Sequence, residues 1–134
     1  MPVARGLPMT GARITIRLDF GKNAAGRNIQ LGHGKIRLLE MIAENGSISS
    51  AARAMKMSYR RAWLLMDEVN SMFDKPLFET QPGGKGGGHA KLTEFGQGVV
   101  DLYRRIEADA EGNFSTDMRT LTRAVSGKVE SNAR

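Results

Sequence analysis

Residues 46–66, GSISSAARAMKMSYRRAWLLM, have the pattern of two short helices joined by a tight turn. Ser47 and Ser58 each precede a run of helix-forming residues, and a serine in that place can accept a backbone N–H of the first helical turn. Ala51 and Ala52 are small enough for two helices to cross steeply over a short turn. The pattern therefore predicts a helix-turn-helix whose second helix begins after Ser58.

A twenty-residue frame that begins at Ile48 tests this pattern position by position. Every place expected to be buried holds a small or apolar residue, and these residues are Ala51, Ala52, Met55, Met57, Ala62 and Leu65, continued by Met66 and Val69. The ninth place, often glycine in such motifs, holds Lys56. A two-helix core with no role in DNA binding would show the same pattern and is the alternative.

The same frame leaves the start of the second helix facing outward, with Ser58, Tyr59, Arg60, Trp63, Leu64 and Asp67 exposed. A recognition helix enters the major groove by its N-terminal end. Arg60 suits bidentate donation to guanine, Ser58 and the nearby N–H groups suit a phosphate, and Tyr59 can reach either. We expect Trp63 to pack on the wing or on a partner subunit, the alternative being contact with thymine methyls. Arg61 is expected to meet a phosphate or an acidic neighbour.

The segment before this motif predicts a strand, a connector and a helix. Residues 13–20 alternate strictly, which predicts a half-buried strand with one apolar face formed by Ile14, Ile16, Leu18 and Phe20. Residues 21–34 are punctuated by glycines and predict a connector. From Lys35 the apolar residues follow a helical period, and Asn45-Gly46 predicts the end of that helix.

The segment after the motif predicts a hairpin. Residues 77–80 and 90–92 read as its two strands, and the glycine-rich residues 83–88 as its turn. Lys85 in this turn can neutralise a DNA phosphate. A nucleotide-binding loop would instead need a serine or threonine after the lysine and a helix behind it. We expect His89 to be a residue at the base of the hairpin rather than a metal ligand.

A long helix follows, capped by Thr93 and closed by Gly112. Its apolar residues keep a helical spacing, and they are Phe95, Val99, Leu102, Tyr103 and Ile106. This stripe is longer than one small domain readily covers, so we expect it to join two copies of the chain. The alternative is a monomer in which the stripe packs on the first helix and on residues 14–20. Ser115 can cap one more short helix.

The predicted order of strand, three helices, hairpin and long helix is that of a winged helix-turn-helix, mainly α with a small β wing. We expect residues 1–11 to be a flexible arm, residues 12–112 to form the DNA-binding domain, and residues 113–134 to be a tail.

Composition narrows the classes of function. The 134 residues carry a net charge of +6, and residues 1–37 hold seven basic residues against Asp19 alone, which favours a polyanionic partner. Cysteine is absent and there are two histidines, so thiolate sites are excluded and we expect no metal and no cofactor. The same absence fits a reducing cytoplasm. No membrane span is expected. Without a convergent nucleophile, acid–base pair or metal cluster, we expect the chain not to be an enzyme.

Three motifs carry a family resemblance. Residues 46–49 (GSIS), 57–63 (MSYRRAW) and 83–93 (GGKGGGHAKLT) resemble the N-terminal domain of the ModE family of molybdate-responsive transcriptional regulators, over about residues 12–110. The helix-turn-helix is also similar to that of LysR-type regulators. His89 stands where the wing of that family usually continues with glycine. ModE proteins also carry C-terminal oxyanion-binding domains, for which the 24 residues after Ala110 leave no room, so we expect this chain not to bind molybdate.

The resemblance implies a DNA-binding homodimer, joined largely through the long helix and elements near the N-terminus, with a link to molybdenum metabolism. The residues expected to contact double-stranded DNA are Ser47, Ser49, Ser58, Tyr59, Arg60, Arg61, Trp63, Lys85 and Lys91. We therefore expect a sequence-specific, homodimeric transcriptional regulator. The alternatives are a winged-helix module that binds another protein, with its acidic long helix as the docking face, and an architectural nucleic-acid-binding module without operator specificity.

Overall fold

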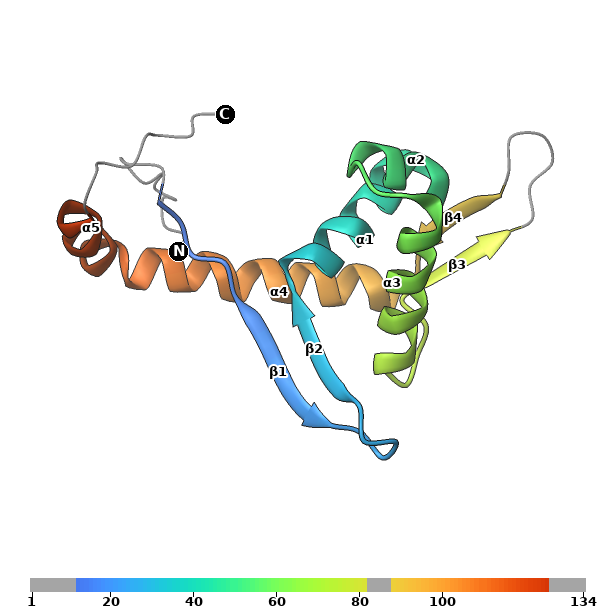
Figure 1. Cartoon of the computed structure of the whole chain (residues 1–134), viewed down its shortest axis with the longest axis horizontal. Helices are drawn as coiled ribbons and strands as arrows, with labels where there is room; N and C mark the ends of the chain where they lie inside the picture. Colours follow the sequence, from blue (N-terminus) through green and yellow to red (C-terminus); the bar gives the residue numbers. More distant parts are fainter. Residues whose placement is uncertain (1–11, 82–87, 126–134) are drawn as a thin grey trace. The chain divides into compact units, whose positions relative to one another are not determined.

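The computed structural model describes residues 12–81 and 88–125. These residues divide into two compact units, the first formed by residues 17–103 and the second by the described residues on either side. The elements are β1 (Arg17–Lys22), β2 (Asn28–Gly32), α1 (His33–Asn45), α2 (Ile48–Ala54), α3 (Tyr59–Met72), β3 (Phe78–Gln81), β4 (His89–Leu92), α4 (Glu94–Asn113) and α5 (Ser115–Ala124) (Figure 1). No helix in these ranges is long and apolar enough to cross a membrane.

The order of elements in the first unit confirms the predicted winged helix-turn-helix. Three helices pack together, and two small antiparallel hairpins, β1–β2 and β3–β4, flank them in the sequence. The core is centred on α1, whose inward face is at most 5% exposed and consists of Ile36, Leu38, Leu39, Met41 and Ile42. Removing that much apolar surface from water supplies the main driving force for this arrangement.

The helix-turn-helix forms through the predicted caps. The Ser47 Oγ accepts the N–H of Ser50 at 3.1 Å, and the Ser58 Oγ accepts the N–H of Arg61 at 3.0 Å. Ala51, Ala52 and Ala62 are at most 2% exposed, as a close crossing of α2 and α3 requires. The turn places these two helices so that the start of α3 stays on the surface.

Lys56 sits at the centre of that turn in a left-handed conformation. Its φ is +58°, the one positive φ of a non-glycine residue in the described chain. Its N–H donates to the Arg53 carbonyl at 3.1 Å, and the next N–H, that of Met57, donates to the Ala52 carbonyl at 3.0 Å. The place usually given to glycine therefore keeps the backbone shape that glycine favours.

The N-terminal strand is shorter than predicted and has a partner that the sequence did not reveal. The strand begins at Arg17 rather than at residue 13, and it pairs antiparallel with β2 inside the segment predicted as a connector. Asn23 builds the reversal, because its Oδ1 accepts the N–H groups of Ala25 and Arg27. A bulge between Asp19 and Lys22 breaks the strict alternation, and Phe20 is 57% exposed rather than half-buried.

The wing is the hairpin of β3 and β4. Phe78 pairs with Leu92 and Gln81 with His89, so the two strands are in register along their whole length. The N–H of Ala90 donates to the Gly46 carbonyl at 2.9 Å, which attaches β4 to the end of α1. Residues 82–87, including Lys85, lie outside the described residues, and so do residues 1–11 and 126–134.

The long helix α4 begins as predicted. The Thr93 Oγ1 accepts the N–H of Gly96 at 2.9 Å and donates to the Pro76 carbonyl at 2.8 Å. The helix continues through Gly112 to Asn113. A short helix α5 follows, but its cap residue is Phe114, so Ser115 is the first helical residue and not the cap. In the second unit, the N–H of Ile14 donates to the Glu111 carboxylate at 3.0 Å. Ile14 thus bonds to α4 and not to a neighbouring strand.

Candidate nucleic-acid interface

The N-terminal end of α3 is a surface feature of the first unit. Five of the six residues predicted to face outward are exposed, with Tyr59 at 54% and Leu64 at 57%, and Ser58, Arg60 and Asp67 exposed as well, as is Arg61. Trp63 is half-buried. Since the first turn of a helix carries unpaired N–H groups and the positive end of the helix dipole, this end suits a negatively charged ligand.

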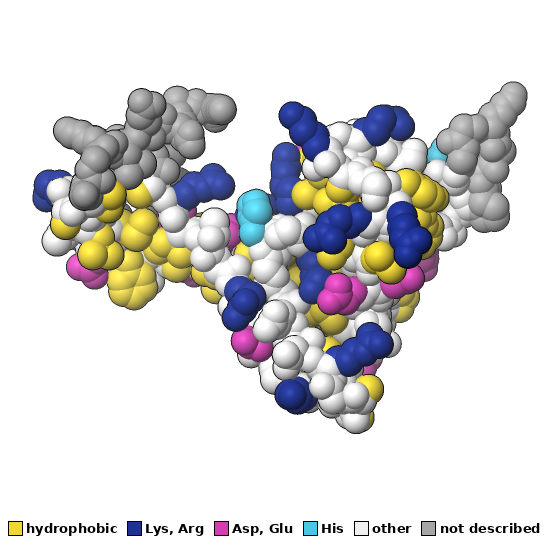
Figure 2. Space-filling view, viewed as in Figure 1, with side chains coloured by type: hydrophobic (Ala, Val, Ile, Leu, Met, Phe, Trp, Pro, Cys, Tyr) yellow, Lys and Arg dark blue, Asp and Glu magenta, His cyan; other side chains and the backbone are white. Residues whose placement is uncertain are grey.

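Two arginines at this end have no acidic partner among the described residues. Two cations on α1 do have acidic partners. The Lys35 Nζ lies 3.5 Å from the Glu68 carboxylate, and an Arg37 nitrogen lies 3.6 Å from that of Glu40. Arg60 and Arg61 are thus the cations at this helix end that stay available for a polyanion. Figure 2 shows Lys and Arg side chains spread over the helical part of this unit.

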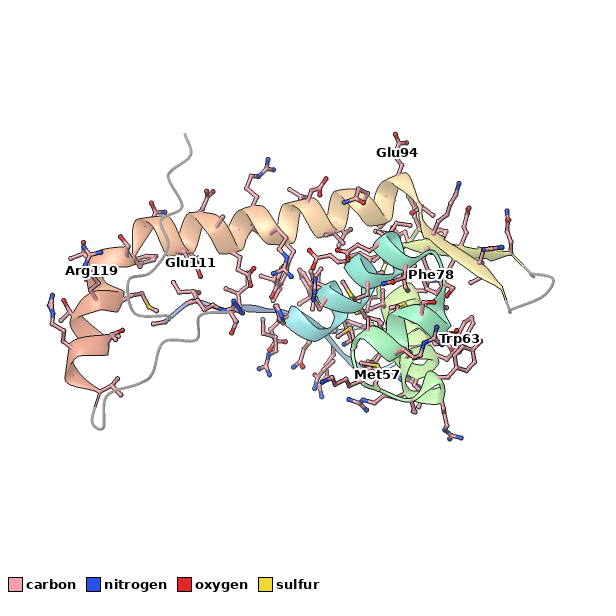
Figure 3. The ribbon with its side chains drawn as sticks, turned by 90° about the horizontal axis from the view of Figure 1, so that it is seen from above. Met57, Trp63, Phe78, Glu94, Glu111 and Arg119 are labelled. Carbon is pink, nitrogen blue, oxygen red and sulfur yellow. The ribbon has the colours of Figure 1, made fainter. Side chains whose placement is uncertain are left out.

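Trp63 packs on the wing. Its ring centroid lies 6.5 Å from that of Phe78 on β3 and 6.2 Å from that of Tyr59, which meets it edge-on. Figure 3 shows the labelled Trp63 and Phe78 next to each other, one from α3 and the other from β3. Phe78 is 5% exposed, so this aromatic contact fixes the recognition helix against the hairpin. The packing predicted for Trp63 is confirmed.

A cavity of about 340 Å³ opens between α2, α3 and the hairpin. Two predicted contact residues of α3, Tyr59 and Trp63, line it together with Ser49 of α2. Its remaining lining is Ile48, Thr80, Gly88, His89 and Ala90. These residues were not predicted as site residues, because they meet only when α2 and the hairpin are folded side by side.

The other predicted contact residues lie at the edges of this region. Lys91 is exposed on β4, and Ser47 is half-buried with its hydroxyl engaged as the α2 cap. His89 is the first residue of β4, opposite Gln81, and so stands at the base of the hairpin as predicted. In the described ranges, no group of three His, Cys, Asp or Glu residues could hold a metal ion.

The predicted apolar stripe of α4 separates into two faces. Tyr103 is 1% exposed and lies in the core of the first unit with Gly96 and Val100. Leu102 and Ile106 are 51% and 45% exposed. Phe95 and Val99 are half-buried.

Phe95 has its own partners within the first unit. Its ring centroid lies 5.7 Å from that of Phe73, and the Lys75 Nζ lies 5.5 Å from the centre of the Phe95 ring. The exposed part of the predicted stripe is thus centred on Leu102 and Ile106.

Residues 33–97 match a family model described as bacterial regulatory helix-turn-helix protein, lysR family. The molybdenum transport protein ModE of Azotobacter vinelandii is 30% identical over 122 residues, which cover 91% of this chain and 44% of that protein. The DNA-binding transcriptional dual regulator ModE of Escherichia coli K12 is 45% identical over 69 residues, 52% of this chain and 26% of that protein.

Among solved structures, an OxyR variant from Pseudomonas aeruginosa aligns with a TM-score of 0.47 and 19% identity, over 69% of this chain and 28% of that one. The chain spans less than half the length of each ModE relative that it matches.

Proposed function

We propose that the protein is a sequence-specific DNA-binding transcriptional regulator, because residues 33–97 match the LysR-type helix-turn-helix model and the chain is similar to ModE regulators. The observation that carries the proposal is the exposed start of α3, where Arg60 and Arg61 have no acidic partner in the described residues. A helix end of this kind, held against a wing by Trp63 and Phe78, is suited to the major groove.

The polar and charged contact residues have proposed roles. Arg60 donates to the O6 and N7 atoms of a guanine, which gives base discrimination. Arg61, Lys91 and Lys85 meet phosphates and position the domain without reading sequence. The hydroxyls of Ser47, Ser49 and Ser58 and that of Tyr59 add hydrogen bonds to the sugar–phosphate backbone.

We propose that the regulator is a homodimer joined through α4. Leu102 and Ile106 supply the exposed apolar surface, and Phe95 and Val99 supply its half-buried continuation. A two-fold dimer places two recognition helices roughly 34–36 Å apart, one turn of DNA, so that the operator is a palindrome.

The names of the relatives support a link to molybdenum. The proposed targets are genes of molybdenum transport or metabolism, and the protein acts in the cytoplasm, where bacterial DNA lies. The chain matches 44% or less of the length of each of these relatives, and we assign DNA reading, not oxyanion sensing, to it. The domain described here therefore works as the DNA-reading part, without catalysis.

Selection of bound sequences from a random pool of DNA duplexes tests the proposal. Enrichment of one palindrome is the expected result, because a symmetric dimer reads two equal half-sites. Recovery of unrelated sequences would support the architectural alternative. No retention of DNA at low salt would support a protein-interaction module, whose partner would dock on the acidic α4.

A further inference from the structure

The cavity between α2, α3 and the hairpin has polar groups that the helix caps leave unused. The hydroxyls of Ser47 and Ser58 accept backbone N–H groups, and that of Ser50 accepts from Arg53. The side chain of Ser49, which lines the cavity, has no hydrogen-bond partner among the described residues. The same holds, within those residues, for Thr80 and His89 on the two strands of the hairpin. Three uncommitted donors from separate elements thus border one cavity.

The rest of the lining is apolar or aromatic. Ile48 and Ala90 are each 4% exposed, and Trp63 is held in place by Phe78. Neither a lysine nor an arginine is found among the lining residues that the structure describes. An apolar wall with hydrogen-bond donors along it suits a ligand that combines the C–H face of a sugar ring with an oxyanion, as a deoxyribose with its phosphodiester does. Hydroxyl side chains commonly donate to phosphate and sugar oxygens of DNA.

We propose that this cavity seats one sugar–phosphate unit of the DNA backbone, with Ser49, Thr80 and His89 as donors to its phosphate and Trp63 against its sugar. The inference rests on the proposed function. When α3 lies in the major groove, a backbone strand of the DNA passes over the cavity bordered by α2, α3 and the hairpin. The hydroxyls of Ser49 and Thr80 carry no charge and release no counterion, so their contribution to affinity does not depend on salt.

The experiment uses the full chain and the palindrome selected above. Ser49→Ala and Thr80→Val each remove a hydroxyl, and each is expected to weaken binding roughly three- to tenfold. The loss is the same on the operator and on unrelated duplexes, and the slope of log affinity against log salt stays unchanged. Lys91→Ala, on the neighbouring strand position, lowers that slope by about one unit instead. Ser71→Ala, at the far end of α3, is the matched control and leaves affinity unchanged.

His89 is tested by two variants. His89→Ala removes the donor and is expected to weaken binding to the same extent as the loss of one hydroxyl, whereas His89→Gln keeps an N–H donor and restores most of the affinity. A wall residue acting only by packing would not show this difference. Circular dichroism melting of each variant separates a loss of contact from a loss of fold.

Substitution of single phosphates by methylphosphonates locates the contact. At one position in each half-site, the neutral phosphate is expected to weaken wild-type binding but to have no further effect on the Ser49→Ala, Thr80→Val double variant. If wild type binds the operator and the double variant binds equally well, the cavity seats no DNA and this inference alone fails. If wild type binds no operator at all, the proposed function itself fails.

Discussion

Gly96 of α4 lies directly against the backbone carbonyl of Leu77, so close that a Cβ on Gly96 would overlap the carbonyl oxygen. The same carbonyl accepts the N–H of Thr93 at 3.0 Å, and the N–H of Leu77 donates to the Asn70 Oδ1 at 2.9 Å. Leu77 is itself fully buried. One backbone unit therefore joins the end of α3, the entry to the wing and the start of α4.

Gly96→Ala is expected to destabilise the protein by about 1–3 kcal/mol, because the added methyl group forces α4 away from Leu77. Helix propensity alone favours the alanine by about 1 kcal/mol, so the expected sign is opposite to that of an ordinary helical position. Urea unfolding measures the difference.

Gly98→Ala is the matched control in the same helix, since nothing lies within 4 Å of a Cβ at that position. It is expected to stabilise by about 0.5–1 kcal/mol. Equal effects of the two substitutions would show that the close approach of Gly96 to Leu77 does not affect the free energy of unfolding.

Lys56→Gly is expected to stabilise the protein by about 1 kcal/mol. Lys56 has a φ of +58°, which costs an L-residue about 1–2 kcal/mol and costs glycine nothing. Lys56→Ala keeps the unfavourable conformation and should bring no gain. The free energies of unfolding of the two variants are compared. Equal stabilities would mean that the positive φ of residue 56 costs no free energy.

Leu102→Glu is expected to convert a dimer into a monomer without unfolding it, because Leu102 is half exposed in the single chain. Sedimentation at micromolar concentration should give wild type twice 14.6 kDa and the variant 14.6 kDa. Gln97→Glu adds the same charge at another exposed position of α4 and should stay dimeric. A wild-type mass near 14.6 kDa would refute the dimer.

Added molybdate is expected to leave the melting temperature and the operator affinity unchanged. A ligand that binds only the folded state, at about 100 times its dissociation constant, stabilises by about 2.7 kcal/mol, which a melting curve resolves. A clear rise in melting temperature would reveal an oxyanion site in this chain.

Local signals made the helix-turn-helix predictable. A cap depends on a few neighbouring residues, so Ser47 and Ser58 could be assigned from the sequence, and both accept the expected N–H groups. The strand β2 could not be predicted in this way. Its short run Asn28–Gly32 has only two apolar positions, and its pairing depends on a turn that Asn23 builds.

The buried face of α4 and the cavity beside Trp63 could not be predicted, because both depend on contacts between segments far apart in the sequence. Helical spacing placed Tyr103 in one stripe with Leu102, but which of two adjacent stripes faces the core depends on where α4 meets Leu77. The cavity beside Trp63 likewise exists only once α2 and the hairpin are assembled, so nothing in the sequence around Thr80 and His89 predicts it.

Binding of the Arg60→Ala variant to every single-base variant of the selected operator shows whether the start of α3 reads bases. We expect a loss of about 1–3 kcal/mol on the operator and a relaxed preference at one base position in each half-site. Equal weakening on all sequences, with every base preference kept, would mean that Arg60 touches only phosphate and would contradict base reading at the start of α3.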